Sequence, residues 1–176
     1  MTSTDTSTED TPIVVYGAYG YTGRLIVEAL LARGHVPTLA GRSSEKVAIM
    51  GEKLGLPYRA LSLEDRTALD ELLEPARVVI NAAGPFIHTY EPVVAACLRT
   101  RTHYLDITGE QPVYQKLYAH NELAQAMEVS LIPGMGFDVV PTDCLASYVA
   151  SQVQEPSLLE LAIVPSGQPS AGTLKT

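Results

Sequence analysis

Three glycines that follow a short β-branched run constrain the fold of this chain more than any other feature. Residues 13–16 (Ile-Val-Val-Tyr) lead into Gly17, Gly20 and Gly23, and residues 24–31 are typical of a helix. Strand, glycine loop and helix in that order are typical of the first βαβ unit of a nucleotide-binding sheet. In this interpretation Gly17 permits the turn, Gly20 lets backbone N–H groups approach a pyrophosphate, and Gly23 lets the helix pack closely on the sheet. The spacing is one residue wider than G-x-G-x-x-G, and such a pattern alone also fits an ordinary turn.

Strand-like and helix-like segments alternate along the rest of the chain. After the first strand, further strands are predicted at residues 36–41, 58–63, 77–83, 103–108 and 129–133. Helices are predicted at residues 22–33, 44–54, 67–73, 90–99, 113–127 and 140–153. These units predict an α/β fold with a doubly wound parallel sheet, whose first and fourth strands meet at the switch point. A further strand is predicted at residues 158–164.

Composition limits the kinds of partner and compartment. The 176 residues suit one well-buried domain, and the net charge of −8, with no Lys/Arg-rich block, argues against nucleic acid but not against a nucleotide. Cys97 and Cys144 lie far apart, which favours a reducing, cytoplasmic setting. Residues 1–11 are predicted to be a disordered polar tail, and no run approaches the roughly 20 apolar residues of a transmembrane segment.

The end of the second predicted strand bears on the choice of cofactor. NAD-binding domains of this type carry an acidic residue there, whereas this chain has Arg42 followed by Ser43. An arginine can bind a 2′-phosphate, so the sequence predicts that NADPH is preferred over NAD; alternatively, Arg42 is simply a solvated residue. Asp65, after the third strand, is a candidate for the edge of the adenine pocket or for a helix cap.

The end of the fourth predicted strand is a candidate for the nicotinamide side. Small residues at 81–85 would let the ring approach the backbone, although a buried strand that turns at Gly-Pro is the alternative. Candidate proton donors at this end of the sheet are His88, Tyr90, Tyr104, Asp106 and Asp138. None of them is assigned a catalytic role, and no metal-ligand spacing occurs in the sequence. The predicted cofactor-binding residues are Gly17, Ala18, Tyr19, Gly20, Tyr21, Thr22, Gly23, Arg42, Ser43, Asp65, Asn81, Ala82, Ala83, Gly84 and Pro85.

Five segments in a fixed order carry a family resemblance. They are GAYGYTG at 17–23, AGR at 40–42, VINAAGPF at 79–86, YLDITGE at 104–110 and GFDVVPTD at 136–143. With these segments the chain resembles the saccharopine dehydrogenase-like oxidoreductases, including the trans-acting enoyl reductase branch. The resemblance implies an NAD(P)-binding Rossmann domain followed by a second α/β domain that closes the substrate site. Family members carry S-x-G-T early in that second domain, and residues 170–173 match it.

The expected organisation is therefore a tail at 1–11, a Rossmann domain at 12–155 and the beginning of a truncated second domain at 156–176. The leading hypothesis is an NADP(H)-dependent oxidoreductase whose cofactor-binding half is this chain, with a small-molecule substrate supplied through the missing domain. One alternative is a non-catalytic NADP(H)-sensing module that acts through a partner, and another is an epimerase or lyase that keeps its nicotinamide bound. The unpaired strand at 158–164 predicts either self-association into a homo-oligomer through residues after Pro156 or a mobile tail.

Overall fold

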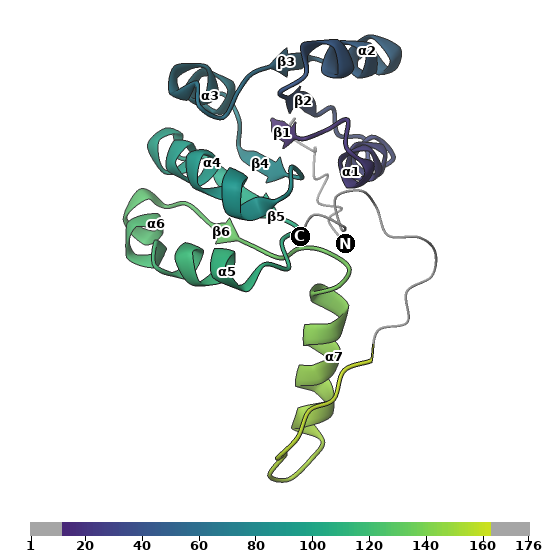
Figure 1. Cartoon of the computed structure of the whole chain (residues 1–176), viewed down its shortest axis with the longest axis vertical. Helices are drawn as coiled ribbons and strands as arrows, with labels where there is room; N and C mark the ends of the chain where they lie inside the picture. The colour runs from purple at the N-terminus through teal and green to yellow at the C-terminus, as the bar shows by residue number, and fades with distance from the viewer. Residues whose placement is uncertain (1–11, 163–176) are drawn as a thin grey trace, which may run out of the picture.

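A six-stranded parallel sheet forms the centre of the computed structural model, which describes residues 12–162 (Figure 1). The strands are β1 (Ile13–Tyr16), β2 (Thr38–Gly41), β3 (Tyr58–Ala60), β4 (Val78–Asn81), β5 (His103–Asp106) and β6 (Leu131–Ile132). Their order in the sheet is β3-β2-β1-β4-β5-β6, and every neighbouring pair is parallel. This arrangement confirms the predicted doubly wound sheet, with its switch point between β1 and β4.

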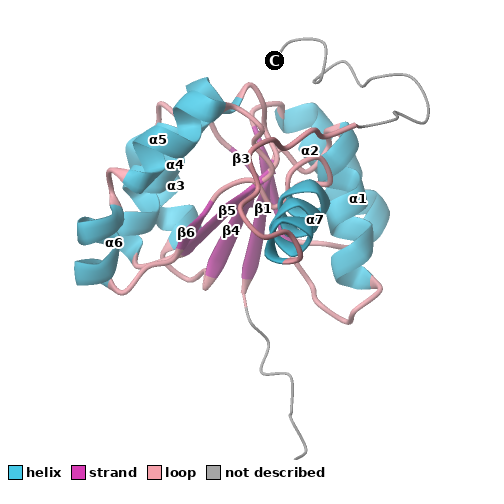
Figure 2. Cartoon of the chain, turned by 90° about the horizontal axis from the view of Figure 1, so that it is seen from below, coloured by secondary structure: helices cyan, strands magenta, loops and turns pink. Residues whose placement is uncertain are grey.

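Helices cover both faces of the sheet. They are α1 (Tyr21–Leu31), α2 (Ser44–Leu54), α3 (Arg66–Leu73), α4 (Phe86–Thr100), α5 (Gln111–Tyr118), α6 (Asn121–Met127) and α7 (Val140–Ser151). Figure 2 shows α1 and α2 on one side of the sheet and α3 to α6 on the other. Alternate residues of β1 therefore enter different cores: Val15 packs with Val27 of α1, whereas Val14 and Tyr16 pack with residues of α3 and α4.

Helix α4 begins at Phe86, four residues before the predicted start. The carboxylate of Glu110 accepts hydrogen bonds from the backbone N–H groups of Phe86 (2.7 Å) and Ile87 (2.9 Å). These N–H groups have no partner inside the helix, and the negative charge also suits the positive end of the helix dipole. A residue 24 positions downstream thus fixes the start of the helix.

The single helix predicted at residues 113–127 is wrong. The structure has two helices, α5 and α6, separated by Ala119 and His120. The N–H group of His120 donates to the carbonyl of Leu117 (3.0 Å), a tighter i to i−3 bond that ends α5. His120 and Asn121 both have low helix propensity, which makes this the place where the helix breaks.

The strand predicted at residues 158–164 is also not observed where the structure describes it. Residues 156–162 have no regular secondary structure, and their large apolar side chains Leu158, Leu159 and Leu161 are exposed. Figure 1 shows α7 and this segment projecting away from the body that holds the sheet, so none of the strands β1 to β6 lies beside it to complete its hydrogen bonds. Residues 163 and 164, the predicted tail at 1–11 and the segment at 170–173 lie outside the described residues.

The projecting helix α7 contributes no buried residue to the body of the protein. Leu145, Tyr148 and Val149 are exposed on it.

Across residues 12–162, no helix has both the length and the apolar composition needed to cross a membrane.

Candidate functional site

A pocket of about 340 Å³ lies at the carboxyl ends of the central strands. It is lined by Tyr16, Gly17, Tyr19, Gly20, Tyr21, Thr22, Gly41, Arg42, Ala82, Ala83 and Gly84. We call it the switch-point pocket, because its walls are the segments that follow β1, β2 and β4. The crevice beyond the carboxyl ends of the strands, at the switch point, is where open α/β sheets bind ligands.

Two of the three loop glycines are required by the backbone. Gly17 has φ +83°, and a Cβ there would lie 2.9 Å from the backbone nitrogen of Ala83. A Cβ on Gly23 would collide with the carbonyl oxygen of Gly17 and would come within 2.9 Å of that of Ala18. Gly17 thus lets the turns after β1 and β4 touch, and Gly23 lets α1 pack under the loop.

The third glycine, Gly20, lies at the start of α1 and faces the pocket. It is the N-cap residue, with φ −68° and ψ 169°, and no side chain caps the helix. Tyr21 and Thr22 form the first turn of α1 and line the pocket, while Ala18 is fully buried beneath the loop. The first N–H groups of α1 therefore have no side-chain acceptor, so the positive end of the helix faces the pocket.

The end of β2 brings a cation to the pocket. Arg42 is exposed and is the only charged residue in the pocket lining within the described part of the chain. Ser43 lies outside the lining and caps α2, because its Oγ accepts a hydrogen bond from the N–H group of Lys46 (3.3 Å). Tyr19 joins the glycine loop to this segment: its hydroxyl accepts a hydrogen bond from the N–H group of Ser43 (3.2 Å).

Asp65 makes the capping contact that the sequence left as one of two interpretations. Its Oδ1 accepts a hydrogen bond from the N–H group of Ala68 (3.0 Å) at the start of α3. Asp65 does not line the switch-point pocket. Its role at an adenine pocket stays a prediction.

The floor of the pocket is held by side chains that lie behind it. Asn81 is fully buried, and its Oδ1 accepts a hydrogen bond from the N–H group of Ala83 (3.1 Å). The hydroxyl of Thr89 donates to the carbonyl of Ala83 (2.7 Å) and accepts from Nδ2 of Asn81 (3.2 Å). The backbone N–H and carbonyl groups of Ala83 are thus both held by hydrogen bonds. Two residues further on, Pro85 is the N-cap residue of α4. Sequence reasoning named Asn81 as a cofactor contact but missed Thr89, because nothing in a helical threonine indicates that it bonds back to the preceding loop.

A buried polar network continues behind this floor. The hydroxyl of Tyr104 accepts from Nδ2 of Asn81 (3.3 Å) and donates to Oδ2 of Asp106 (2.7 Å). Oδ1 of Asp106 also accepts from the N–H groups of Thr108 (2.9 Å) and Gly134 (2.8 Å). Burial raises the pKa of Asp106, while these hydrogen bonds oppose that rise by stabilising the carboxylate. The network ties the loops after β4, β5 and β6 together.

The five candidate proton donors do not converge on the pocket. Tyr104 and Asp106 are fully buried in the network just described, and Tyr90 is buried in the core. His88 and Asp138 are also absent from the residues that line the pocket. No group of three or more His, Cys, Asp or Glu side chains that could hold a metal ion occurs among residues 12–162.

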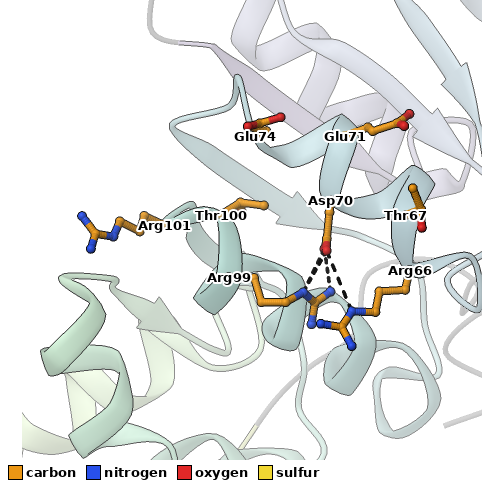
Figure 3. Close-up of a pocket in the computed structure, with 8 residues that line it drawn as sticks. All are labelled: Arg66, Thr67, Asp70, Glu71, Glu74, Arg99, Thr100 and Arg101. Atoms are coloured by element: carbon orange, nitrogen blue, oxygen red, sulfur yellow. Dashed lines mark hydrogen bonds and ion pairs between the residues drawn. The ribbon is translucent and has the colours of Figure 1, made fainter.

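A second depression, of about 460 Å³, lies between α3 and α4 and is shown in Figure 3. Three arginines and three carboxylates line it, and Asp70 accepts hydrogen bonds from Arg99 and forms an ion pair with Arg66. The hydrogen bonds from Arg99 lower the pKa of Asp70. The positive and negative side chains that line this groove between α3 and α4 balance one another, and the groove lies between two helices that cover the sheet. It therefore has neither the position nor the net charge of a phosphate site.

The fold and the glycine loop together define a nucleotide-binding domain of the Rossmann type. The chain belongs to the saccharopine dehydrogenase NADP-binding domain family, whose model matches residues 13–131. It is 32% identical over 170 residues to the saccharopine dehydrogenase-like oxidoreductase of Mus musculus, an alignment that covers 84% of this chain and 39% of that protein. It is 35% identical over 139 residues to the trans-acting enoyl reductase of Mycobacterium leprae, and this alignment covers 74% of this chain and 33% of that protein.

Solved structures show the same fold. Apo saccharopine dehydrogenase (L-Glu forming) from Saccharomyces cerevisiae superposes with a TM-score of 0.68 at 18% identity, covering 80% of this chain and 31% of that one. AtPrR2 with NADP+ and (+)pinoresinol gives a TM-score of 0.55 at 22% identity, covering 71% of this chain and 49% of that one. The chain thus spans less than half the length of each of these proteins. The family resemblance drawn from the sequence is confirmed.

The buried network behind the pocket generates a stability prediction for Tyr104→Phe. This change leaves Oδ2 of Asp106 and Nδ2 of Asn81 without their shared partner, which costs about 1–3 kcal/mol in the free energy of unfolding. Because the lost hydrogen bond favours the ionised carboxylate, the pKa of Asp106 rises further in the variant. The cost is therefore larger at a pH above the raised pKa of Asp106, where the group is ionised, and shrinks as the pH falls through that pKa.

Urea unfolding of both proteins at several pH values measures this difference. Tyr58→Phe is the matched control, since Tyr58 is exposed and its hydroxyl makes only a long contact with Glu52 (3.4 Å). A cost for Tyr104→Phe that is no larger than that of the control, or that grows in acid, contradicts the account of the network.

Proposed function

We propose that this chain is the cofactor-binding half of an NADP(H)-dependent oxidoreductase and that it prefers NADPH to NADH. The observation that carries the proposal is the composition of the switch-point pocket. An uncapped helix N-terminus and one arginine, Arg42, face it, and none of the residues between 12 and 162 that line it is a carboxylate. Membership of an NADP-binding domain family supports the same conclusion.

The pyrophosphate is proposed to lie at the start of α1. Tyr21 and Thr22 line this part of the pocket at a helix start that no side chain caps, and the helix dipole favours an anion there. Gly20 leaves the space in front of them open, since a Cβ on it would contact only the carbonyl oxygen of Gly17, at 3.1 Å.

The preference for NADPH rests on Arg42. A carboxylate at the end of β2 would accept hydrogen bonds from both ribose hydroxyls of NADH and would repel a 2′-phosphate. This chain has an exposed guanidinium there instead, and guanidinium groups bind phosphate oxygens through two parallel hydrogen bonds.

The nicotinamide is proposed to lie near Ala82, Ala83 and Gly84, whose small side chains leave the pocket open beside β4. The substrate, a small molecule, is proposed to bind against a second domain. The curated relatives are more than twice as long as the aligned part of this chain, and the unburied apolar helix α7 offers a surface for such a domain.

Replacing Arg42 with Asp tests the cofactor preference. We expect the unmodified chain to bind NADPH more tightly than NADH, and Arg42→Asp to reverse or abolish that difference. A charge-assisted hydrogen bond to phosphate contributes about 1.5–3 kcal/mol, which corresponds to roughly 10- to 150-fold in affinity. Calorimetric titration with each cofactor measures both dissociation constants.

Arg33→Asp provides the control, since it makes the same change of net charge at an exposed residue outside the pocket. Equal affinities of the unmodified chain for the two cofactors, or equal effects of the two substitutions, would contradict the role given to Arg42.

The glycine loop is tested by Gly20→Val. The backbone angles of Gly20 suit any residue, so the fold should persist, while the added side chain fills the space in front of the first N–H groups of α1. We expect dinucleotide binding to be lost and the circular dichroism spectrum to stay close to that of the unmodified chain. Ala29→Val adds the same kind of side chain at an exposed position of the same helix and should bind normally. A folded Gly20→Val variant that still binds would show that the loop is only a structural turn.

A further inference from the structure

Tyr19 makes an unusual bridge across one end of the switch-point pocket. Its ring lies against Gly41, where an added Cβ would come within 2.5 Å of the ring, and its hydroxyl accepts the N–H group of Ser43 (3.2 Å). Gly41 and Ser43 flank Arg42 in the sequence, so one aromatic side chain holds both neighbours of the arginine. The ring therefore fixes the segment from which Arg42 reaches the pocket.

The same ring holds a second cation close to this segment. The Nζ atom of Lys46 lies 5.9 Å from the centroid of the Tyr19 ring, within the range of a cation–π interaction. Lys46 is the third residue of α2, and helical side chains lean toward the N-terminus of their helix. The ring therefore holds the ammonium group near Tyr19, a residue that lines the switch-point pocket.

Lys46 has no competing partner in the part of the chain that the structure describes. The ion pairs found there join Arg59 with Glu71 and Asp70 with Arg66 and Arg99, and Lys46 takes part in none of them. The nearest acidic neighbour in sequence, Glu45, is exposed in the first turn of the same helix. An ammonium that is held in place by an aromatic ring but not neutralised by a carboxylate remains free to bind an anion.

We propose that Lys46 is a second cationic ligand for the 2′-phosphate of NADP(H), and that Tyr19 is the residue that positions it. The inference rests on the proposed function, because Tyr19 lines the same pocket, whereas Lys46 lies against Tyr19 outside the lining. Arg42 directly precedes the N-cap residue of α2 and Lys46 lies in the first turn of that helix, so a phosphate dianion bound at this helix end would have two cations and the positive end of a helix as neighbours. NADH carries a hydroxyl group at this point and gains nothing from the ammonium. The contribution of Lys46 is therefore to selectivity between the two cofactors.

The test uses the full chain and titrates it with NADPH and NADH. Lys46→Met keeps the apolar stem but removes the charge, and we expect it to weaken NADPH binding by about tenfold while NADH binding changes less than about twofold. Lys53→Met removes the same charge from the exposed last turn of α2 and should leave both affinities unchanged. Raising the salt concentration should reduce the effect of Lys46→Met, because the lost contact is between exposed charges.

Two substitutions of Tyr19 separate positioning from general packing. Tyr19→Phe keeps the ring and should retain most of the NADPH/NADH selectivity. Tyr19→Leu removes the ring and should lower that selectivity, both through the ammonium of Lys46 and through the Arg42 segment. The part that acts through the ammonium cannot be lost twice, so the loss in the Tyr19→Leu/Lys46→Met double variant should be smaller than the sum of the two single losses. Selectivity that falls additively in the double variant would overturn the positioning role.

The outcomes also separate this inference from the proposed function. An unmodified chain that selects NADPH, together with a Lys46→Met variant that selects it equally well, overturns the role of Lys46 alone. Equal losses for NADPH and NADH in Lys46→Met overturn it as well, since they would show a general effect on the pocket. An unmodified chain that binds neither cofactor overturns the proposed function and this inference with it.

Discussion

The contact between the turn after β1 and the turn after β4 is the constraint on which the candidate site depends. Gly17 adopts a positive φ, and a single added carbon atom there would lie 2.9 Å from the backbone nitrogen of Ala83. Asn81 and Thr89 hold Ala83 from behind through hydrogen bonds to its N–H and carbonyl groups. Because both turns are fixed against each other, the pocket has a firm floor before any ligand arrives. Preorganisation of this kind reduces the entropy lost on binding.

The electrostatics of the site are local. The chain carries a net charge of −8, which on its own would disfavour a ligand with several phosphates. Exposed charges more than about 10 Å apart are largely screened at ordinary salt concentrations, so the nearest groups decide. In the pocket these are Arg42 and the start of α1, whereas Asp70 and Glu71 of the groove between α3 and α4 are paired with arginines.

Local patterns predicted much of this structure, and long-range contacts account for the errors. The glycine loop and the order of strands and helices follow from local preferences that the tertiary structure does not override. The start of α4 could not be predicted, since Glu110 caps it from 24 residues away. The strand expected at 158–164 was inferred from an apolar run alone, whereas a strand also needs a neighbour to complete its hydrogen bonds. Whether an apolar segment pairs with a neighbouring strand depends on the tertiary structure of the rest of the chain.

The candidate site shows the same division. Sequence reasoning placed Arg42 and the glycines at one pocket, which the structure brings together, but it also grouped with them Asn81 and Ser43, which lie behind or beside the lining. Their side chains bond to the backbone of neighbouring loops and helices, and such support has no sequence pattern of its own. Lys46 was missed for a related reason, since its relation to the pocket depends on the ring of a residue 27 positions earlier.

Dinucleotide binding in the switch-point pocket is tested most directly by an NMR titration of the backbone amides with NADPH. The account predicts that the largest shifts fall on residues 17–23, 42–43 and 82–84, around the switch-point pocket. It also predicts that the residues lining the groove between α3 and α4, such as Arg66 and Arg101, shift little. Large shifts confined to that groove, or a glycine loop that does not respond to saturating NADPH, would contradict the account.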